Sequence, residues 1–459
     1  MISIDVDKRS APFIVEYPSF DRMRLLDGRE GIEASIARLE GSISLYLHIP
    51  FCRHRCDFCY YRVLTNSSQE LRRLYLRSLL REISFYGRLV PGRAVEVATI
   101  YWGGGTPSYL SAEEMAQIHN AVQKNFRIAP KVEFTVEVEP GTATPEKLQV
   151  LNEIGANRLS IGAQHFNDLI LKANGRPHRA AATYRCVELA RASGFWNVNI
   201  DLISGLLGDS PALWPDLMSA VLALQPESVS IYRLQVLPNT ILAQTGELPF
   251  ENAVLAPTVE TEIADFAYQT LEGQGYLPDT SFSFTKGTAF AHRHRRFAWT
   301  DTPMLGLGVS AYSTLPGLMF QNSRSFENYL ADTAQGRWAV KRAHLLSAEE
   351  AAIRTFVLGV KLGRVRFAEL APSLLDSAIA AARDLADWEL ATATDIGFDL
   401  SRRGRILADD IIAWYLRQAG LTRAQGDLSV GPRAADGHRA VSSQPSPSGK
   451  LVSLLRRAK

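Results

Sequence analysis

Three cysteines lie close together in the first part of the chain. Cys52, Cys56 and Cys59 fall within eight consecutive residues of the segment HIPFCRHRCDFC. Three thiolates on one loop can bind three irons of a [4Fe-4S] cubane and leave the fourth iron open for an external ligand. A structural zinc site is the alternative, and it would need a fourth ligand such as His48 or His54. The paired C-x2-C knuckles usual for zinc are missing, so the spacing favours the iron–sulfur cluster.

Two further motifs contain residue types suited to ligand binding. The run Gly103–Pro107 (GGGTP) follows an apolar segment, and glycine lets backbone groups approach a ligand without a Cβ in the way. A plain tight turn is the alternative for this run. Glu137 stands near the end of the segment EFTVEV, and strand ends present ligand-binding groups on the rim of a barrel. The nearby Glu139 is interpreted as a cap of the following turn.

The segments that must position these residues alternate between strand and helix patterns. Apolar, β-rich segments occur near 43–50 and at 97–102, 133–138, 158–164, 196–202 and 228–234. Capping boxes at Ser67–Glu70 and Ser111–Glu114 predict helix starts, and Thr144–Pro145 begins a helix that Gly155 ends. Regular β–α alternation predicts a parallel sheet. Six such units favour an α/β fold with a partial (β/α)6 barrel of the TIM type; an open doubly wound sheet is the alternative.

The composition along the chain predicts five parts: an N-terminal segment (1–42), the barrel (43–256), a barrel-completing, substrate-side region (257–340), a small C-terminal module (341–418) and a tail (419–459). One helix and irregular, aromatic-rich segments are expected in the third part. A capping box at Ser347–Glu350, helices near 347–362, 372–388 and 402–417 and two short segments around 390–400 predict a winged-helix-like module. The Gly-, Ser- and Pro-rich tail is predicted to be disordered, and its last residues, LVSLLRRAK, to fray.

Overall composition limits the possible partners. The 459 residues have a formal net charge of +2, which gives no global electrostatic reason to expect nucleic acid. No apolar run reaches the roughly 18 residues that span a bilayer, and the N-terminus lacks a signal-peptide pattern, so no membrane partner and a cytoplasmic location are expected. Four cysteines cannot form a dense disulfide framework. Cys186 is predicted to be a small core residue of a helix.

The cysteine loop, preceded by YLHIPF, resembles the radical S-adenosylmethionine (SAM) motif, and the ordered motifs resemble the oxygen-independent coproporphyrinogen III oxidase family over roughly residues 43–418. That family also contains heme chaperones, heme-degrading methyltransferases and the class C methyltransferases and cyclopropane-forming enzymes. The resemblance implies that Cys52, Cys56 and Cys59 hold a [4Fe-4S] cluster whose open iron chelates SAM. It further implies reductive cleavage to a 5′-deoxyadenosyl radical and two bound SAM molecules.

The resemblance also assigns SAM contacts to positions that match the family's motifs. Phe58 would flank the adenine, the glycine motif the methionine amino group, Glu137 and Asp201 the ribose hydroxyls, and Arg176 a methionine carboxylate. The full set of implied SAM-contacting residues is Tyr46, Phe58, Gly104, Gly105, Thr106, Glu137, Gln164, Arg176, Asp201 and Tyr312. A reduced flavodoxin- or ferredoxin-type electron donor and a small, unsaturated or tetrapyrrole-like substrate complete what the resemblance implies.

Three departures from the family pattern bear on the reaction. The oxidases have a fourth cysteine two residues after the third, and here that position is Tyr61. The heme chaperones' H-N-x-x-Y-W motif keeps only its ends in His294–Trp299, and Ser204 and Leu207 replace an aromatic residue and a proline. We therefore expect methyl or methylene transfer to an unsaturated carbon, with oxidative decarboxylation of coproporphyrinogen and heme trafficking as alternatives. The basic cluster His292–Arg296 could contact a carboxylate-bearing substrate; a solvated basic turn is the favoured alternative, and no catalytic role is assigned to the cluster.

Overall fold

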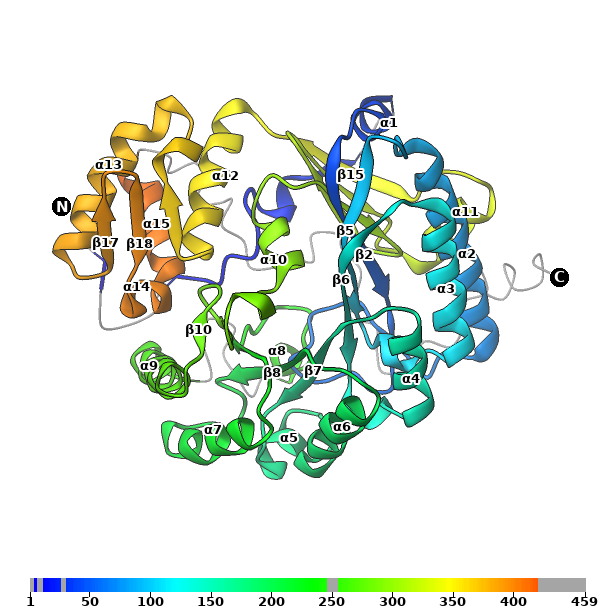
Figure 1. Cartoon of the computed structure of the whole chain (residues 1–459), viewed down its shortest axis with the longest axis horizontal. Helices are drawn as coiled ribbons and strands as arrows, with labels where there is room; N and C mark the ends of the chain where they lie inside the picture. Colours follow the sequence, from blue (N-terminus) through cyan, green and yellow to red (C-terminus); the bar gives the residue numbers. More distant parts are fainter. Residues whose placement is uncertain (1–3, 6–10, 26–29, 246–254, 420–459) are drawn as a thin grey trace.

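The computed structural model describes residues 4–5, 11–25, 30–245 and 255–419. The predicted tail from residue 420 onward, with its terminal LVSLLRRAK, lies outside them. Six parallel strands, hydrogen-bonded in chain order, form the centre of a 13-stranded sheet. They are β2 (Gly41–Ile49), β5 (Val95–Gly104), β6 (Ile128–Val138), β7 (Arg158–Gln164), β8 (Val198–Ser204) and β9 (Ser228–Arg233). Each overlaps a predicted strand, and the curved array with outer helices is the predicted partial barrel (Figure 1).

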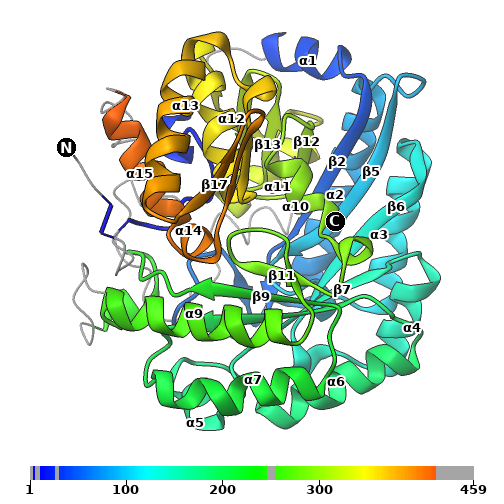
Figure 2. The same cartoon turned by 60° about the vertical axis from the view of Figure 1, so that its left-hand side comes forward.

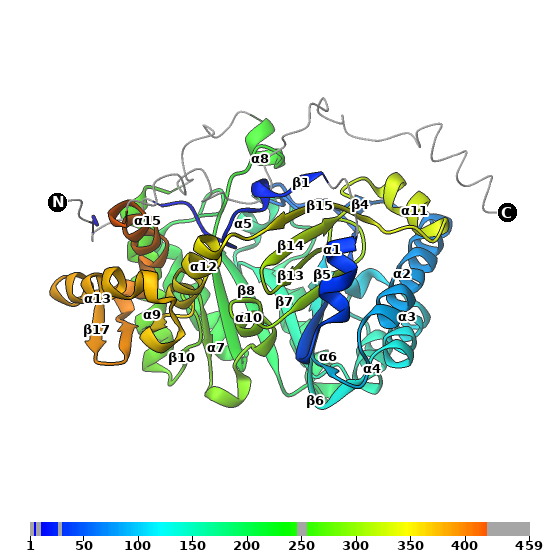
Figure 3. The same ribbon diagram turned by 90° about the horizontal axis from the view of Figure 1, so that it is seen from above.

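Helices connect consecutive strands on the outer side of the barrel, where Figure 3 shows α2, α3 and α4 side by side. The connecting helices are α2 (Gln69–Leu89), α3 (Ala112–Asn125), α4 (Pro145–Glu153), α5 (Asp168–Ala173), α6 (Ala180–Ala192) and α7 (Trp214–Ala223). The Ser111 capping box and the Thr144 cap are present as predicted. The box predicted at Ser67 is wrong by one residue, because the Ser68 side chain accepts the hydrogen bond from the Leu71 amide and Ser67 is buried.

Residue alternation along the strands separates two environments. Side chains such as Leu45, Trp102, Val136, Ile161 and Ile200 belong to the apolar core between strands and helices. The opposite positions carry buried hydroxyl or amide groups that bond to one another across strands: Thr99 to Ser44, Ser230 to Asn199, and Asn199 to Ser160. Barrel interiors are usually filled with branched apolar residues. This lumen is polar, and the same alternation continues upward to place carboxylates at the C-terminal rim.

The region 257–340 is more regular than the sequence indicates. After α9 (Pro257–Gly273), β10 (Leu277–Pro278) and β11 (Ser283–Thr285) extend the sheet beyond β9. On the other edge β12 (Met304–Leu307) pairs parallel with β2, and β13 (Tyr312–Leu315), β14 (Leu318–Asn322), β15 (Val340–Leu345) and β1 (Arg24–Leu25) follow antiparallel. The expectation of a single helix is wrong, since α10 (Arg293–Ala298) and α11 (Phe326–Ala334) also form. Most of these strands have two to five residues, too few for a periodic pattern.

Residues 348–418 form a compact unit beside the open edge of the barrel (Figure 2). It contains α12 (Ala348–Lys361), β16 (Arg364–Arg366), α13 (Pro372–Asp387), β17 (Ala391–Thr394), β18 (Gly397–Leu400), α14 (Arg402–Ile406) and α15 (Ala408–Gln418). The capping box at Ser347 is present. The predicted single helix 402–417 is interrupted at Leu407, and the three strands pair in the order β16-β18-β17. The winged-helix-like interpretation of this unit stays a prediction.

A largely buried ion pair within this unit contacts the N-terminal segment. Lys361 Nζ lies 2.8 Å from Asp409 Oδ1 and 4.1 Å from the centre of the Phe13 ring. The Ile14 amide donates to the same Asp409 oxygen. The remaining short elements are α1 (Glu30–Ala37), β3 (Phe51–Cys52), β4 (Leu64–Thr65) and α8 (Ile241–Gln244). In the part of the chain that the structure describes, no helix has both the length and the apolar character needed to span a bilayer.

Candidate active site

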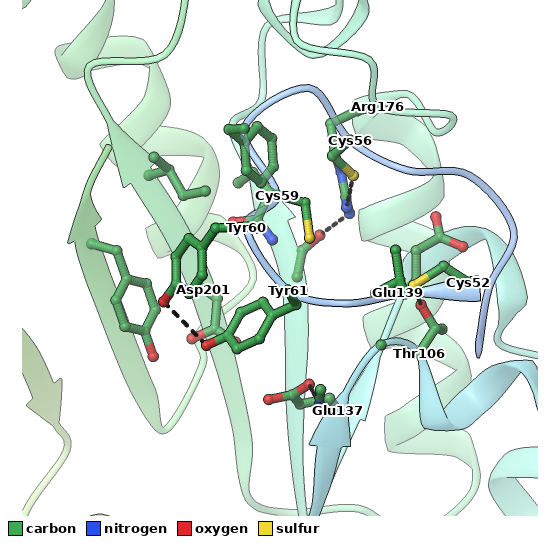
Figure 4. A pocket seen from close by; sticks show the side chains of 18 of the residues that line it. Cys52, Cys56, Cys59, Tyr60, Tyr61, Thr106, Glu137, Glu139, Arg176 and Asp201 are labelled. Atoms are coloured by element: carbon green, nitrogen blue, oxygen red, sulfur yellow. Dashed lines mark hydrogen bonds between the residues drawn. The ribbon is translucent and has the colours of Figure 1, made fainter. Parts of the chain in front are cut away.

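A cavity of about 280 Å³ opens at the C-terminal ends of the parallel strands. The cysteine loop between β3 and β4 forms one wall, and the ends of β5 to β9 form the opposite wall (Figure 4). Polar residues at strand ends converge here because the C-terminal ends of parallel strands meet on one edge. Of the predicted site residues, eleven line this cavity: Cys52, Cys56, Phe58, Cys59, Gly104, Gly105, Thr106, Glu137, Gln164, Arg176 and Asp201.

The three thiols of the loop are free and open on the same cavity. Cys52 Sγ is 3.3 Å from Thr106 Oγ1, and Arg176 Nη1 donates to Cys56 Sγ at 3.2 Å. Burial raises the pKa of Cys52 to about 11 and that of Cys59 to about 12. In the metal-free chain these thiols therefore carry protons, which an incoming metal must displace to obtain thiolate ligands.

The arrangement of the thiols distinguishes between the two metal sites that the sequence leaves open. Among the described residues, no three His, Cys, Asp or Glu side chains converge closely enough to hold one metal ion. A zinc site needs four such ligands on one ion, whereas a cubane distributes its thiolates over separate irons. Of the two histidines that could complete a zinc site, His54 lines the cavity and His48 does not. Three separated thiols around one cavity fit a [4Fe-4S] cluster with one iron left free of protein ligands.

The glycine run at the end of β5 packs against the cysteine loop. A Cβ on Gly104 would lie 2.3 Å from the His48 ring, and one on Gly105 would lie 2.6 Å from the carbonyl oxygen of Ile49. Gly104 also has a φ of +102°, which L side chains rarely adopt. The Gly105 and Thr106 amides donate to the carbonyls of Ile49 and Phe51, so this run fixes where the cysteine loop begins. The close approach of two backbone segments is thus one reason for glycine at these positions. The ligand contact expected from the sequence is the other.

Replacing Gly104 by alanine is expected to lower the free energy of unfolding by about 3 kcal/mol, from backbone strain together with the clash on His48. Denaturant unfolding of the metal-free chain measures the loss. The matched control is Gly155→Ala, because Gly155 also has a positive φ, +87°, but open space at its Cβ position. Equal losses in the two variants would show that the contact with His48 is unimportant.

Two carboxylates stand near the end of β6 in different environments. Glu137 accepts hydrogen bonds from the Tyr101 hydroxyl at 2.7 Å and from the Gly104 amide at 3.0 Å. Burial raises the pKa of Glu137 to about 7. Burial acts to raise the pKa of Glu139, but the contact with His178, whose Nδ1 lies 3.5 Å from Glu139 Oε1, and the charge of Arg176 outweigh it and lower the pKa. Glu139 caps the turn that follows by accepting from the Gly141 amide, as predicted from the sequence.

Three more predicted SAM contacts reach the cavity from neighbouring strands and loops: Asp201, Gln164 and Arg176. Asp201 accepts from the Ser160 hydroxyl at 2.6 Å and from Asn199 Nδ2 at 2.8 Å, while burial raises its pKa. Gln164 has a φ of +66°, a strained conformation that in proteins is concentrated at functional sites. Arg176 Nη2 donates to the Gly162 carbonyl, which aligns its other terminal nitrogen with the cysteine loop.

Two predicted contact residues lie beside the cavity wall rather than in it. Tyr46 is bonded to His48 and stacks on Tyr101 with ring centres 6.1 Å apart. Tyr312 packs on Phe20 with ring centres 4.4 Å apart. Neither belongs to the lining of the cavity, so their roles as SAM contacts stay predictions.

Several lining residues are not among those predicted from the sequence, including Tyr60, Tyr101, Ser160 and Tyr232. Tyr101, Ser160 and Tyr232 occupy inward-facing strand positions in phase with Gly103, Gly162 and Ser230, so strand alternation was the signal that could have found them. Tyr60 and Tyr61 follow Cys59 directly. Their rings stack with centres 4.5 Å apart, and their hydroxyls are 3.3 Å apart over the cavity.

The basic cluster His292–Arg296 is not a solvated turn, and that interpretation is wrong. His292 and His294 are buried, and Glu133 accepts hydrogen bonds from the amides of Arg293 and His294 at the start of α10. The cluster is buried because α10 faces the polar lumen of the barrel, where charged and polar side chains have buried partners. Burial lowers the pKa of His294 to about 3, so the imidazole is neutral and bonds to Thr99. Cys186, in contrast, lies in the apolar core as predicted.

Comparisons with known proteins identify a family, several relatives and a solved structure that this chain resembles. Residues 46–221 match the radical SAM superfamily. The chain is 33% identical over 321 residues to the oxygen-independent coproporphyrinogen III oxidase of Paracoccus denitrificans, covering 67% of this chain and 70% of the relative. It is 28% identical to the heme chaperone HemW of Bacillus subtilis, covering 81% of this chain and 99% of that protein. The solved coproporphyrinogen III oxidase of Escherichia coli, a radical SAM enzyme, has the same fold, with a TM-score of 0.77, 24% identity, and coverage of 88% of this chain and 96% of that one.

Proposed function

We propose a function from one premise: this chain belongs to the radical SAM superfamily, and within it to the family of the oxygen-independent coproporphyrinogen III oxidases and HemW. A [4Fe-4S] cluster and SAM are therefore its cofactors. A cluster held by this chain would supply the one-electron reduction of SAM from which a 5′-deoxyadenosyl radical is obtained. The proposed activity is the use of this radical on a small-molecule substrate in the strand-end cavity.

The observation that carries the proposal is the placement of three free thiols opposite a wall of hydrogen-bonding groups. Cys52, Cys56 and Cys59 would hold the cluster and leave one iron open toward the cavity. Glu137 and Asp201 face the same space as acceptors for ribose hydroxyls. Contacts at both ends of SAM would fix its scissile bond relative to the cluster. Such positioning accelerates a reaction because the reacting groups no longer have to find the right geometry by diffusion.

For the substrate, we propose first a carboxylate-bearing, tetrapyrrole-like molecule that undergoes oxidative decarboxylation. This proposal is supported by the relatives that match most of the chain, several of which are coproporphyrinogen III oxidases. It takes precedence over the methyl transfer that Tyr61 suggests from the sequence. A soluble one-electron donor of the flavodoxin or ferredoxin type would supply the reducing electron.

Methyl or methylene transfer from a second SAM is the other candidate, and one observation favours it. The position of the oxidases' fourth cysteine is Tyr61, which stacks on Tyr60 at the mouth of the cavity and is 47% exposed. Two aromatic rings there offer a flat, apolar surface to an unsaturated substrate. For this candidate reaction, the same cavity would have to hold a second SAM molecule.

Anaerobic reconstitution followed by reduction with dithionite and SAM tests the common core of both candidates, with formation of 5′-deoxyadenosine as the expected result. Coproporphyrinogen added to the same reaction should lose carbon dioxide if the chain is a decarboxylase. Methyl-deuterated SAM should label the product if the chain transfers methyl groups. Tight heme binding without any SAM cleavage would instead indicate a heme-trafficking protein. A cluster that is absent, or saturated by four protein ligands, would overturn the proposal.

A further inference from the structure

A short segment that follows β9 lies against the cysteine loop. The Leu242 amide of α8 donates to the Asp57 carbonyl of the loop at 3.0 Å. The buried Leu242 side chain belongs to a small apolar cluster, and Phe58 of the loop packs against the same cluster. Backbone and side-chain contacts therefore join the segment after the last parallel strand to the middle of the cysteine loop, although the two are distant in sequence.

Thr240 fixes the turn that precedes α8. Its hydroxyl donates to the Leu237 carbonyl at 2.7 Å and accepts from the Ala243 amide at 3.2 Å, as the N-cap residue of a helix does. Thr240 is fully buried, so the turn is supported from both sides. Asn239, the residue directly before this cap, is thus held in a defined position next to the cysteine loop.

Asn239 bonds to the cysteine loop in two ways. Its side-chain Nδ2 donates to the Tyr60 carbonyl at 2.6 Å. Its own carbonyl accepts from Arg55 Nη2 at 2.5 Å, and the same nitrogen of Arg55 is 3.4 Å from the Cys59 carbonyl. Two consecutive carbonyls that begin at the third cysteine are therefore bound, and the shorter of the two bonds comes from the Asn239 side chain.

The first cysteine of the loop has a separate anchor. The Thr106 amide donates to the Phe51 carbonyl at 2.7 Å, and the Thr106 hydroxyl is 3.3 Å from Cys52 Sγ. At the other end of the loop, among the described residues, Asn239 is the only residue outside the loop whose side chain bonds to the backbone of Cys59 or of the residue after it. The two ends of the loop are therefore positioned by different parts of the barrel.

We infer that Asn239 is a positioning residue for Cys59. By holding the Tyr60 carbonyl, it fixes the backbone beside the third thiol, so that the thiol keeps its place relative to the other two. Residues that support a metal ligand in this way affect metal affinity although they do not touch the metal. The inference rests on the proposed function, since it assumes that Cys59 is a cluster ligand.

The same hydrogen bond also sets the place of the tyrosine pair. The carbonyl that Asn239 binds belongs to the peptide group between Tyr60 and Tyr61, whose stacked rings lie next to Cys59 (Figure 4). Loss of this bond should therefore loosen the Cys59 end of the loop, whereas the Cys52 end should stay in place. This difference between the two ends makes the inference testable.

The test measures thiol alkylation in the full-length, metal-free chain. Iodoacetamide is added to the unaltered chain, to Asn239→Ala and to Asn239→Asp, and mass spectrometry of the digested protein gives a separate rate for each cysteine. An ionised aspartate keeps the size of asparagine but cannot donate to the Tyr60 carbonyl. We expect both variants to raise the Cys59 rate about tenfold, the effect on local opening of losing one hydrogen bond. The Cys52 rate should stay unchanged.

Asn157→Ala is the matched control. The Asn157 side chain makes the same kind of bond, from Nδ2 to the Val132 carbonyl at 2.7 Å, and it lies directly before β7, at the end of the barrel opposite the cavity. This variant should leave the Cys59 rate unchanged, even if its melting temperature falls. After reconstitution, Asn239→Asp should release iron to a chelator severalfold faster than the unaltered chain, and Asn157→Ala should release it at the unaltered rate.

Two results would overturn the inference. One is a Cys59 alkylation rate or an iron release rate that stays unchanged in Asn239→Asp. The other is an equal acceleration at Cys52, Cys59 and the core residue Cys186, which would show that the substitution loosens the whole chain. Failure of the proposed function looks different, because the unaltered, reconstituted chain would then form no 5′-deoxyadenosine whatever the alkylation rates of the metal-free variants.

Discussion

Replacing Cys59 by alanine is expected to abolish formation of 5′-deoxyadenosine, with a loss of at least ~1,000-fold, equivalent to about 4 kcal/mol of barrier. The reason is that the three thiolates would be the whole protein ligand set of the proposed cluster, so removing one would leave two irons of the cubane without protein ligands. The Cys59 thiol opens on the cavity together with Cys52 and Cys56, and no other cysteine lines it among the described residues. Iron analysis after anaerobic reconstitution should fall from about four atoms per chain to well below one.

Cys186 provides the control for this experiment. It is a buried thiol of α6 in the apolar core, remote from the cysteine loop in sequence and absent from the cavity lining. Cys186→Ala removes one sulfur from the chain and should cost about 1 kcal/mol of stability while leaving iron content unchanged. Full iron and normal cleavage in Cys59→Ala would contradict the assigned ligand set, and a loss of iron in both variants would point to misfolding.

The central part of the fold follows from local patterns that the sequence displays openly. Each of the six parallel strands is a run of five or more residues with apolar side chains on its helix-facing side, and each is followed by a capped helix or a turn. Because strand ends converge in such a sheet, Glu137 on β6 and Asp201 on β8 could be assigned to one rim from their places at the ends of two predicted strands. The cysteine spacing identifies the loop independently of the fold.

The parts that the sequence left open depend on contacts between distant segments. β12 is four residues long and becomes a strand through its pairing with β2, about 260 positions earlier. The cluster His292–Arg296 is highly charged, which normally indicates exposure, but α10 enters a lumen whose inward positions are polar. The hydrogen bond from Arg295 of α10 to the Tyr232 hydroxyl could therefore not be predicted from any local pattern. Burial of charge is a property of the assembled barrel, and composition alone predicts the opposite.

Glu137→Gln is expected to weaken SAM binding about 30-fold, which corresponds to ~2 kcal/mol for a hydrogen bond that an ionised acceptor makes. The amide oxygen can still accept from the Gly104 amide, and the amide nitrogen can donate to the Tyr101 hydroxyl, so the substitution removes charge with little change in shape. Burial holds the pKa of Glu137 at about 7, which means that the carboxylate is charged above that pH and neutral below it. SAM affinity of the unaltered chain should therefore rise between about pH 6 and pH 8.

In Glu137→Gln this rise should become smaller, because the only remaining rim carboxylate of the pair is Asp201. Glu139→Gln is the control: Glu139 lies two residues further along, lines the same cavity and has a lowered pKa, so it stays charged across this pH range. Its carboxylate is already engaged with the Gly141 amide and His178, and its removal should leave both SAM affinity and the pH profile unchanged.

If Glu139→Gln weakened SAM binding as much as Glu137→Gln, general negative charge on the rim, rather than one directed acceptor, would account for the binding. A change in SAM affinity confined to Glu137→Gln, with the pH dependence reduced, is the outcome that identifies the ribose acceptor.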